Sequence, residues 1–280
     1  MEWERAKSLL ILFFIALNIV LAGFLFLENR RYTLRSENER VIRSVLAQHD
    51  VSLSADMIRR FAPMRALRVS GYYYNEDELL AIFFQNPEAV TRTDAVLGGA
   101  EFYKDASQLV INNGLITYFN PYGLHVTVEE FISRHFPNFQ RDAFFNPQDE
   151  EGVRITYRQV YRGYVLYSNF IEFLVTDAGI IEVDMRFGIV QGWDGPARPL
   201  FGPDEILITF LQVYRQRIQP FRDDRHTVIW HMDIVYFHEF ENTSDERDST
   251  HLTMPFYRIF VEGLDLPFLI NAYMNVSIDV

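Results

Sequence analysis

Three histidines, His226, His231 and His238, lie near one another in the sequence and could serve metal binding or acid–base chemistry. The run 227–240 is typical of a β-strand, in which alternate side chains point to opposite faces, so His231 faces away from the other two. His238 lies twelve positions after His226, a distance of about 40 Å along an extended strand. We therefore do not expect one metal site here, and we expect His231 and Asp233 to form an ordinary surface pair.

Carboxylates give a second candidate site, because Glu182 and Asp184 share a face of the strand expected over 180–190. No clear basic or nucleophilic partner accompanies them in the sequence. The chain has no cysteine, and it lacks the nucleophile elbow, the phosphate-binding loop, the HExxH zinc motif and the dinucleotide fingerprint. These absences predict a protein without catalytic residues, bound metal or cofactor.

The charge balance argues against nucleic acid as a partner. The 280 residues include 26 basic and 38 acidic side chains, for a formal net charge of −12. Binding to a phosphate backbone requires a basic surface, which this composition does not predict. Apolar residues make up 49% of the chain, which is typical of a folded globular protein.

The N-terminus contains a candidate membrane anchor. Residues 8–27 (SLLILFFIALNIVLAGFLFL) are twenty residues without a charge, and as a helix they would span about 30 Å, the thickness of a bilayer core. A signal peptide cleaved after residues 20–22 is the alternative, but the apolar run continues beyond that point. We predict a transmembrane helix in the lipid bilayer, after a tip of residues 1–7. Trp3 and Tyr32 flank it as membrane-interface anchors.

One side of the predicted span carries polar or small side chains. Asn18 and Ala22 are one turn apart, and Ala16 and Gly23 mark a neighbouring stripe. A polar amide in hydrocarbon favours a hydrogen-bonding partner, and small residues let another helix approach closely. We predict that these four residues contact a transmembrane partner. The alternative is a single asparagine that the apolar span tolerates without a partner.

Beyond the span, the spacing of apolar residues predicts an α+β region. Residues 28–50 are expected to form a juxtamembrane helical stalk, and residues 51–126 an N-terminal β-rich section. Residues 127–195 and 196–280 each contain a helical pattern followed by three strand-like runs. We therefore predict two helix-plus-antiparallel-meander units, in which each helix covers one face of its sheet.

Local signals place several elements within these segments. Thr127 and Glu130 form a capping-box pattern at the start of one helix, and Pro203 begins another. Asn113 followed by Gly114 predicts a hairpin turn. The apolar run 79–84 favours a strand.

These features together resemble a known family. The start Met1-Glu2-Trp3 runs through Lys7 directly into one apolar span, before a charged segment and the two units. The closing stretch MPFYRIFVEGLDLPFLINAYMN contains Tyr257-Arg258 and then Asn271-Ala272-Tyr273. This pattern resembles the YycI (WalI) proteins of the YycH/YycI family, membrane-anchored regulators of the WalK/WalR (YycG/YycF) two-component system in Gram-positive bacteria. The sequence departs from the family pattern where the family usually has lysine.

The resemblance implies an orientation that the basic residues on both sides of the span leave open. It implies a cytoplasmic N-terminus and an extracellular C-terminal domain in the cell membrane. It further implies no enzymatic activity and no cofactor. The implied partners are the sensor histidine kinase WalK (YycG) and YycH, contacted partly through transmembrane helices in signalling that governs cell-wall metabolism. Whether the kinase is restrained or stimulated stays open.

Two other classes of function stay open as well. An anchored extracellular binding module for a peptide or wall fragment would need a concave pocket with aromatic walls, such as one between the two units. An anchored hydrolase would need converging acid, base or metal groups. Self-association into a homo-oligomer is also left open by the sequence.

Overall fold

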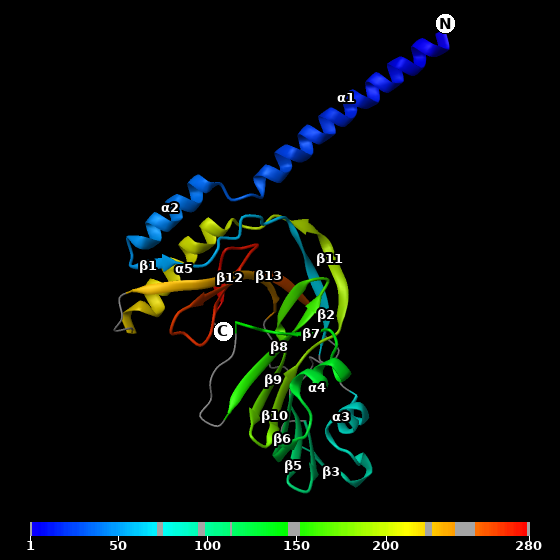
Figure 1. The fold of residues 1–280 in the computed structure, drawn as a ribbon, viewed down its shortest axis with the longest axis vertical. Helices are drawn as coiled ribbons and strands as arrows, with labels where there is room; N and C mark the ends of the chain where they lie inside the picture. The colour runs from blue at the N-terminus through cyan, green and yellow to red at the C-terminus, as the bar shows by residue number, and fades with distance from the viewer. Residues whose placement is uncertain are drawn as a thin grey trace.

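The N-terminal helix projects away from the rest of the protein in the computed structural model (Figure 1). The structure describes residues 2–71, 75–94, 99–112, 114–144, 152–221, 226–238 and 250–278. Helix α1 (Glu2–Arg31) contains the apolar stretch Ala6–Phe24, and none of that stretch is buried against the protein. Its length and composition allow it to cross a membrane, as predicted from residues 8–27.

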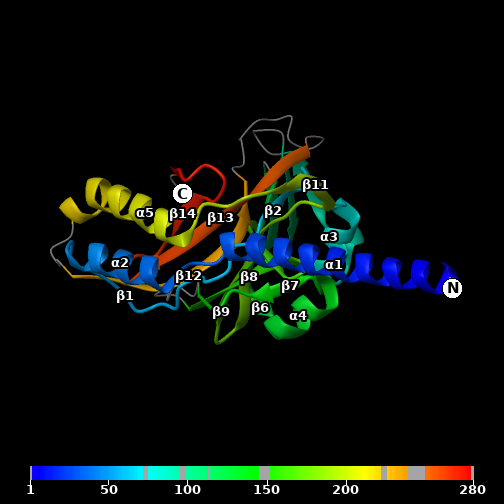
Figure 2. The same ribbon diagram turned by 90° about the horizontal axis from the view of Figure 1, so that it is seen from above.

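Helix α2 (Ser36–Ala47) packs on the body instead of standing free. Ile42 and Leu46 are buried on its inner face. The helix lies beside α5 (Pro203–Arg217) and β1 (Val51–Leu53), as Figure 2 shows from above. Within the predicted segment 28–50, residues 28–31 end α1 and residues 36–47 form α2. α2 is not a stalk, because its apolar stripe packs against a core.

The remaining elements form two lobes. The anchor-side lobe contains α2, α5, the 3₁₀ turn η2 (Gln219–Phe221) and the strands β1, β2 (Met64–Ser70), β11 (Val190–Arg198), β12 (Thr227–Phe237), β13 (Thr250–Val261), β14 (Phe268–Asn271) and β15 (Ser277–Ile278). The distal lobe contains α3 (Glu76–Phe83), η1 (Pro87–Ala89), α4 (Val128–His135) and the strands β3 (Thr91–Asp94), β4 (Ala100–Lys104), β5 (Ser107–Asn112), β6 (Leu115–Leu124), β7 (Phe139–Arg141), β8 (Val153–Tyr161), β9 (Tyr164–Thr176) and β10 (Gly179–Arg186).

In the part of the chain that the structure describes, strand pairing connects the lobes at one point. The strand order is β11-β2-β13-β12-β9-β10-β6-β5-β4-β3. Within the described residues, β12 meets β9 in parallel through a single pair, Tyr236 and Leu166. β1 also runs parallel to β12, whereas neighbouring strands within the rest of each lobe are antiparallel. The lobes therefore depend on side-chain contacts for much of their attachment to each other.

Each lobe has a core between its helices and its strands. In the distal lobe, Phe131 of α4 meets Phe173 of β9 edge-on, with ring centroids 5.5 Å apart. In the anchor-side lobe, Phe210 of α5 meets Phe268 of β14 edge-on at 4.9 Å. Helices packed against antiparallel strands confirm the predicted α+β class.

The predicted starts of two helices and the predicted hairpin turn are confirmed. Thr127 Oγ1 accepts a hydrogen bond from the Glu130 N–H at 3.2 Å, and the Glu130 carboxylate accepts one from the Thr127 N–H at 3.3 Å. Helix α5 begins at Pro203. β5 and β6 form the predicted hairpin with Gly114 at φ +73°, while Asn113 lies outside the described residues.

Other predictions require correction. The strand predicted over 79–84 is wrong, because Leu79–Phe83 belong to α3, whose N-cap Asn75 accepts a hydrogen bond from the Asp77 N–H at 3.0 Å. The section 51–126 does not form a unit of its own. Its strands β1 and β2 pair with β12, β11 and β13 in the anchor-side lobe, and β3–β6 extend the distal sheet. β11 starts within the predicted unit 127–195 but also joins the anchor-side lobe, because β2 is its pairing partner.

Candidate functional site

Arg258 is buried in the middle of β13, between Tyr257 and Ile259, which are also buried. A guanidinium remains charged at ordinary pH and needs oxygen partners when it is removed from water. The register of β12 and β13 places Asp233 directly opposite. Nε of Arg258 donates to Asp233 Oδ1 at 2.9 Å and Nη2 donates to Oδ2 at 2.6 Å. The pair is therefore bidentate, the strongest form of arginine–carboxylate contact.

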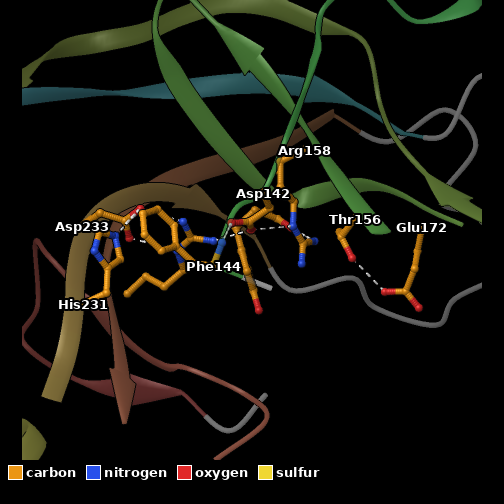
Figure 3. Close-up of polar contacts among 9 residues, drawn as sticks. Asp142, Phe144, Thr156, Arg158, Glu172, His231 and Asp233 are labelled. Atoms are coloured by element: carbon orange, nitrogen blue, oxygen red, sulfur yellow. Dashed lines mark hydrogen bonds and ion pairs between the residues drawn. The ribbon is translucent and has the colours of Figure 1, made fainter. Parts of the chain in front are cut away.

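Asp142 brings the distal lobe to the same guanidinium. It follows β7, and its backbone N–H donates to the Thr156 carbonyl at 2.8 Å, which fixes it beside β8. Its Oδ2 accepts hydrogen bonds from Arg258 Nη1 at 2.6 Å and from Arg158 Nε at 3.4 Å. One carboxylate thus joins arginines from both lobes (Figure 3). We call Asp142, Arg158, Asp233 and Arg258 the interlobe network.

Aromatic rings enclose this network. The Tyr167 ring centre lies 4.1 Å from Arg158 Cζ and 5.3 Å from Arg258 Cζ. Beside Asp233, the Phe144 ring stacks on His231 with centroids 3.6 Å apart (Figure 3). Such ring contacts stabilise guanidinium groups that have lost their water.

The four charges of the network balance. Burial alone would raise the pKa of Asp233, but the hydrogen bonds from Arg258 and the nearby His231 outweigh it and lower that pKa. Burial likewise acts to lower the pKa of Arg258, and its contacts with Asp233 and Asp142 reverse this and raise the pKa. His231 Nε2 lies 3.6 Å from Asp233 Oδ2, so the expected pair is present. Its side chains are only 24% and 27% exposed, so the pair lies at the edge of the network and not on the open surface.

This arrangement suits attachment of the lobes better than proton transfer. A general base needs a lone pair that faces the substrate and a pKa near the working pH. Asp142 and Asp233 instead direct their oxygens at guanidinium groups. Removing one partner of a buried ion pair costs about 3–5 kcal/mol. The interlobe network therefore holds the two lobes in one arrangement.

A second charged cluster lies on the distal sheet face that points away from α4. Arg154 Nη1 lies 3.1 Å from Glu172 Oε1 and 3.3 Å from Glu182 Oε1. Thr117 Oγ1 donates to Asp184 Oδ1 at 2.6 Å. Burial, with a contribution from Glu182, raises the pKa of Asp184. The sequence predicts that Glu182 and Asp184 share one face, and the structure shows Arg154 as the basic partner that this prediction did not include. The alternation of side chains in the strand that begins at Val153 was the available signal for Arg154.

The three histidines of the sequence are not brought together. His226 Nε2 lies 3.2 Å from Ser52 Oγ, whereas His231 lies beside Asp233 of the interlobe network. His238 Nδ1 lies 3.2 Å from Ser168 Oγ, and burial lowers the pKa of His238 to about 3. Among the described residues, no group of three or more metal-binding side chains is arranged to hold an ion.

The residues predicted to contact a transmembrane partner lie on the part of α1 that projects from the body. All four are exposed: Ala16, Asn18, Ala22 and Gly23. A Cβ atom added at Gly23 would meet no atom within 4 Å. This side of the helix leaves room for another helix, and the contact itself stays a prediction. Trp3, at the far end of α1, is 71% exposed, whereas Tyr32 is half-buried at the body.

The connection from α1 to the body is short and hydrogen-bonded. The Phe61 N–H donates to the Tyr32 carbonyl at 3.0 Å, and the Leu34 N–H donates to the Arg59 carbonyl at 2.9 Å. An isolated antiparallel β-bridge lies between these two bonds. Leu34 is buried in the anchor-side core. Helix α1 is therefore fastened to the body by backbone pairing directly after its last turn, and we call this connection the junction.

Comparison with known proteins shows a similarity of fold alone. No family model matches the sequence, and no curated protein matches it. The chain is similar to an uncharacterized protein from Eubacterium rectale ATCC 33656, with a TM-score of 0.50 and 9% identity over 82% of this chain and 91% of that one. The Bacillus megaterium YpeB C-terminal domain gives a TM-score of 0.39 and 9% identity over 74% of this chain and 96% of that one.

Proposed function

We propose that this protein is a membrane-anchored, non-enzymatic regulator of the sensor histidine kinase WalK, which acts together with YycH to tune cell-wall metabolism signalling. In this proposal the N-terminus is cytoplasmic and the body is extracellular. The family resemblance of residues 1–7 and 254–275 supports the assignment. The observation that carries the mechanism is the backbone-paired junction between α1 and the anchor-side lobe.

A regulator of this kind must bind the signalling states of the kinase with different affinities. A body on a flexible linker could not reposition its anchor, because the linker would absorb any displacement. Here the bonds at Tyr32 and Leu34 fasten the end of α1 to the body, so a shift of the anchor-side lobe tilts or moves the helix. Confinement to the membrane raises the effective concentration of neighbouring helices, so weak contacts through Asn18 and Gly23 suffice.

Insertion of a flexible Gly-Ser-Gly-Ser segment between Arg31 and Tyr32 tests this mechanism. We expect the output of a WalR-dependent reporter to change to the level of cells without the protein, at unchanged membrane content. The matched control places the same insertion at Gly163, in the exposed turn between β8 and β9, and should leave regulation intact. Normal regulation by the junction variant would contradict mechanical coupling through α1.

The partners are tested by crosslinking in the membrane followed by mass spectrometry. The full chain would be compared with the same body on an unrelated transmembrane helix and with the double variant Asn18→Leu/Gly23→Leu. We expect WalK and YycH with the full chain, and loss of at least one of them with the exchanged helix. Recovery of neither, while a control membrane complex survives, would refute the regulator proposal.

An anchored extracellular binding module for a peptide or wall fragment is the second candidate. A cleft of about 490 Å³ in the distal lobe favours it, with Phe84, Tyr118 and Phe131 among its walls and Lys104 and Arg134 as cations. Aromatic walls with a few polar groups suit a small ligand. The cleft lies inside one lobe and not between the units, where such a pocket was expected. A thermal shift with soluble wall fragments that Lys104→Gln abolishes would support this function.

A further inference from the structure

A cavity lined by arginines lies at the body end of α1. It has a volume of about 460 Å³ and is bounded by the end of α1, the start of α2 and the N-terminus of α5. Arg30, Arg31 and Arg35 line it together with Asp204 and Glu205. All three arginine side chains are exposed. The cavity therefore combines a basic side with a smaller acidic side.

The position of the cavity along α1 places it at the level of lipid headgroups. The helix runs without interruption from the apolar stretch Ala6–Phe24 to Arg31. At 1.5 Å per residue, Arg30 lies about 9 Å beyond Phe24. The headgroup layer extends roughly 5–8 Å beyond the hydrocarbon core, and an arginine side chain can reach back over several ångströms. The guanidinium groups thus lie within reach of lipid phosphates.

The charge of this cavity differs from that of the whole protein. The chain carries a net charge of −12, which an anionic membrane surface repels. Among the described residues that line the cavity, Arg31 and Arg35 are exposed, and the carboxylates Asp204 and Glu205 both have partners within the protein. Asp204 accepts a hydrogen bond from Asn38 Nδ2 at 2.9 Å, and Glu205 accepts one from the Gly202 N–H at 3.0 Å. The exposed guanidinium groups of Arg31 and Arg35 suit a phosphodiester.

We propose that this cavity binds the headgroup of an anionic phospholipid such as phosphatidylglycerol. The lipid phosphate contacts Arg31 and Arg35, whose planar guanidinium groups match phosphate oxygens. The glycerol hydroxyls of the headgroup donate hydrogen bonds toward Asp204. A bound lipid thus connects α1 to the first turn of α5 and sets the height of the body above the membrane. The site requires only insertion of α1, so it is independent of the identity of the kinase.

Native mass spectrometry of the full chain in detergent micelles tests the site by titration with phosphatidylglycerol or phosphatidylcholine. We expect phosphatidylglycerol to bind at least about tenfold more tightly than phosphatidylcholine, because the choline group of the latter balances its phosphate charge and phosphatidylglycerol has no such cation. The double variant Arg31→Gln/Arg35→Gln should weaken its binding about 25-fold, at roughly fivefold for each arginine near a charged membrane surface. The matched control, Arg141→Gln/Arg162→Gln, removes two exposed arginines of the distal lobe and should bind like the wild type.

Three results would overturn the proposal. One is equal affinity for the two lipids, and another is unchanged affinity in the variant that lacks the two cavity arginines. The third uses glycerophosphoglycerol, which is the headgroup without acyl chains. If this soluble compound binds as tightly as the lipid, the site recognises a free phosphate ester and not the membrane. Thermal unfolding of each variant confirms that the body is folded, which the exposure of these arginines predicts.

Discussion

Removing the guanidinium of Arg258 should strongly destabilise the protein. The side chain is 2% exposed and donates hydrogen bonds of 2.6 and 2.9 Å to Asp233 and of 2.6 Å to Asp142. The substitution Arg258→Met keeps an unbranched apolar side chain and deletes the charge. It leaves the buried Asp142 carboxylate with the longer contact of 3.4 Å from Arg158. The substitution therefore removes one partner of a buried ion pair and leaves the carboxylate of the other partner buried.

The expected magnitude is about 3–5 kcal/mol of unfolding free energy. Each kcal/mol lowers the Tm of a domain of this size by roughly 2–4 °C, so the drop is about 6–20 °C. Thermal unfolding of the full chain in detergent, followed through the fluorescence of Trp193 and Trp230, measures it. Arg92→Met is the matched control, because Arg92 is 53% exposed and its 2.9 Å contact with Asp94 lies at the surface. Exposed pairs contribute less than about 1 kcal/mol.

The same substitution should change the pH dependence of stability. Burial acts to raise the pKa of Asp233, and hydrogen bonds led by that from Arg258 more than reverse this. A carboxylate with a lowered folded pKa contributes stability that is complete above its unfolded pKa of about 3.9 and is lost as the pH falls through the folded value. The difference between wild type and Arg258→Met should thus be constant above about pH 5 and shrink below about pH 4. A variant as stable as Arg92→Met, or a difference that grows in acid, would refute the reasoning.

Three further substitutions test burial at other positions. Burial lowers the pKa of His238 to about 3, so below about pH 6.5 this histidine binds a proton in the unfolded chain but not in the folded protein. The free energy of unfolding should therefore fall by about 2 kcal/mol between pH 6.5 and 5. His238→Asn should remove this loss in pH-dependent thermal melts. Leu46→Ala, at a fully buried side chain of α2, should cost about 2–5 kcal/mol in the same assay, and Val41→Ala, at a side chain 58% exposed, less than about 0.5. Equal effects would mean that α2 is not docked. Gly123→Ala should lower the Tm more than Gly163→Ala. A Cβ atom at position 123 would lie 2.0 Å from a backbone carbonyl oxygen, whereas one at position 163 would meet no atom within 4 Å. Equal Tm values for the two variants would contradict this packing.

Elements with local signals could be predicted from the sequence. The uncharged run 8–27 predicts α1, and the reciprocal bonds of Thr127 and Glu130 match their spacing. Helix α3 was missed because residues 79–84 are apolar throughout, and such a run does not distinguish a strand from a buried helix. The acidic turn that follows Asn75 was the available start signal for this helix.

Pairings between distant segments could not be predicted in the same way. Val51 of β1 lies opposite Thr227 of β12, and neither residue type specifies the other as its partner. Alternation along β13 also could not show that both of its faces are covered, which is what buries Arg258. Its partner Asp142 lies 116 positions earlier in the chain, in a segment without a helix or strand signal of its own. The interlobe network therefore becomes visible only when the two lobes are assembled.

The interlobe network and the junction are the two connections between the distal lobe and the helix α1. Within the described residues the lobes share one backbone pair, so their relative position depends on side-chain contacts. These include the ion pair of Asp142 with Arg258 and the apolar cluster of Tyr167, Val235, Phe256 and Leu269. A partial separation would leave a buried charge without its partner, at a cost of several kcal/mol, so intermediate positions are unfavourable. The proposed mechanism therefore treats the body as one unit, whose displacement the junction passes on to α1. In the proposed function, an event at the distal lobe acts on the kinase only while both connections are intact, and a lipid bound beside the junction would reinforce the second of them.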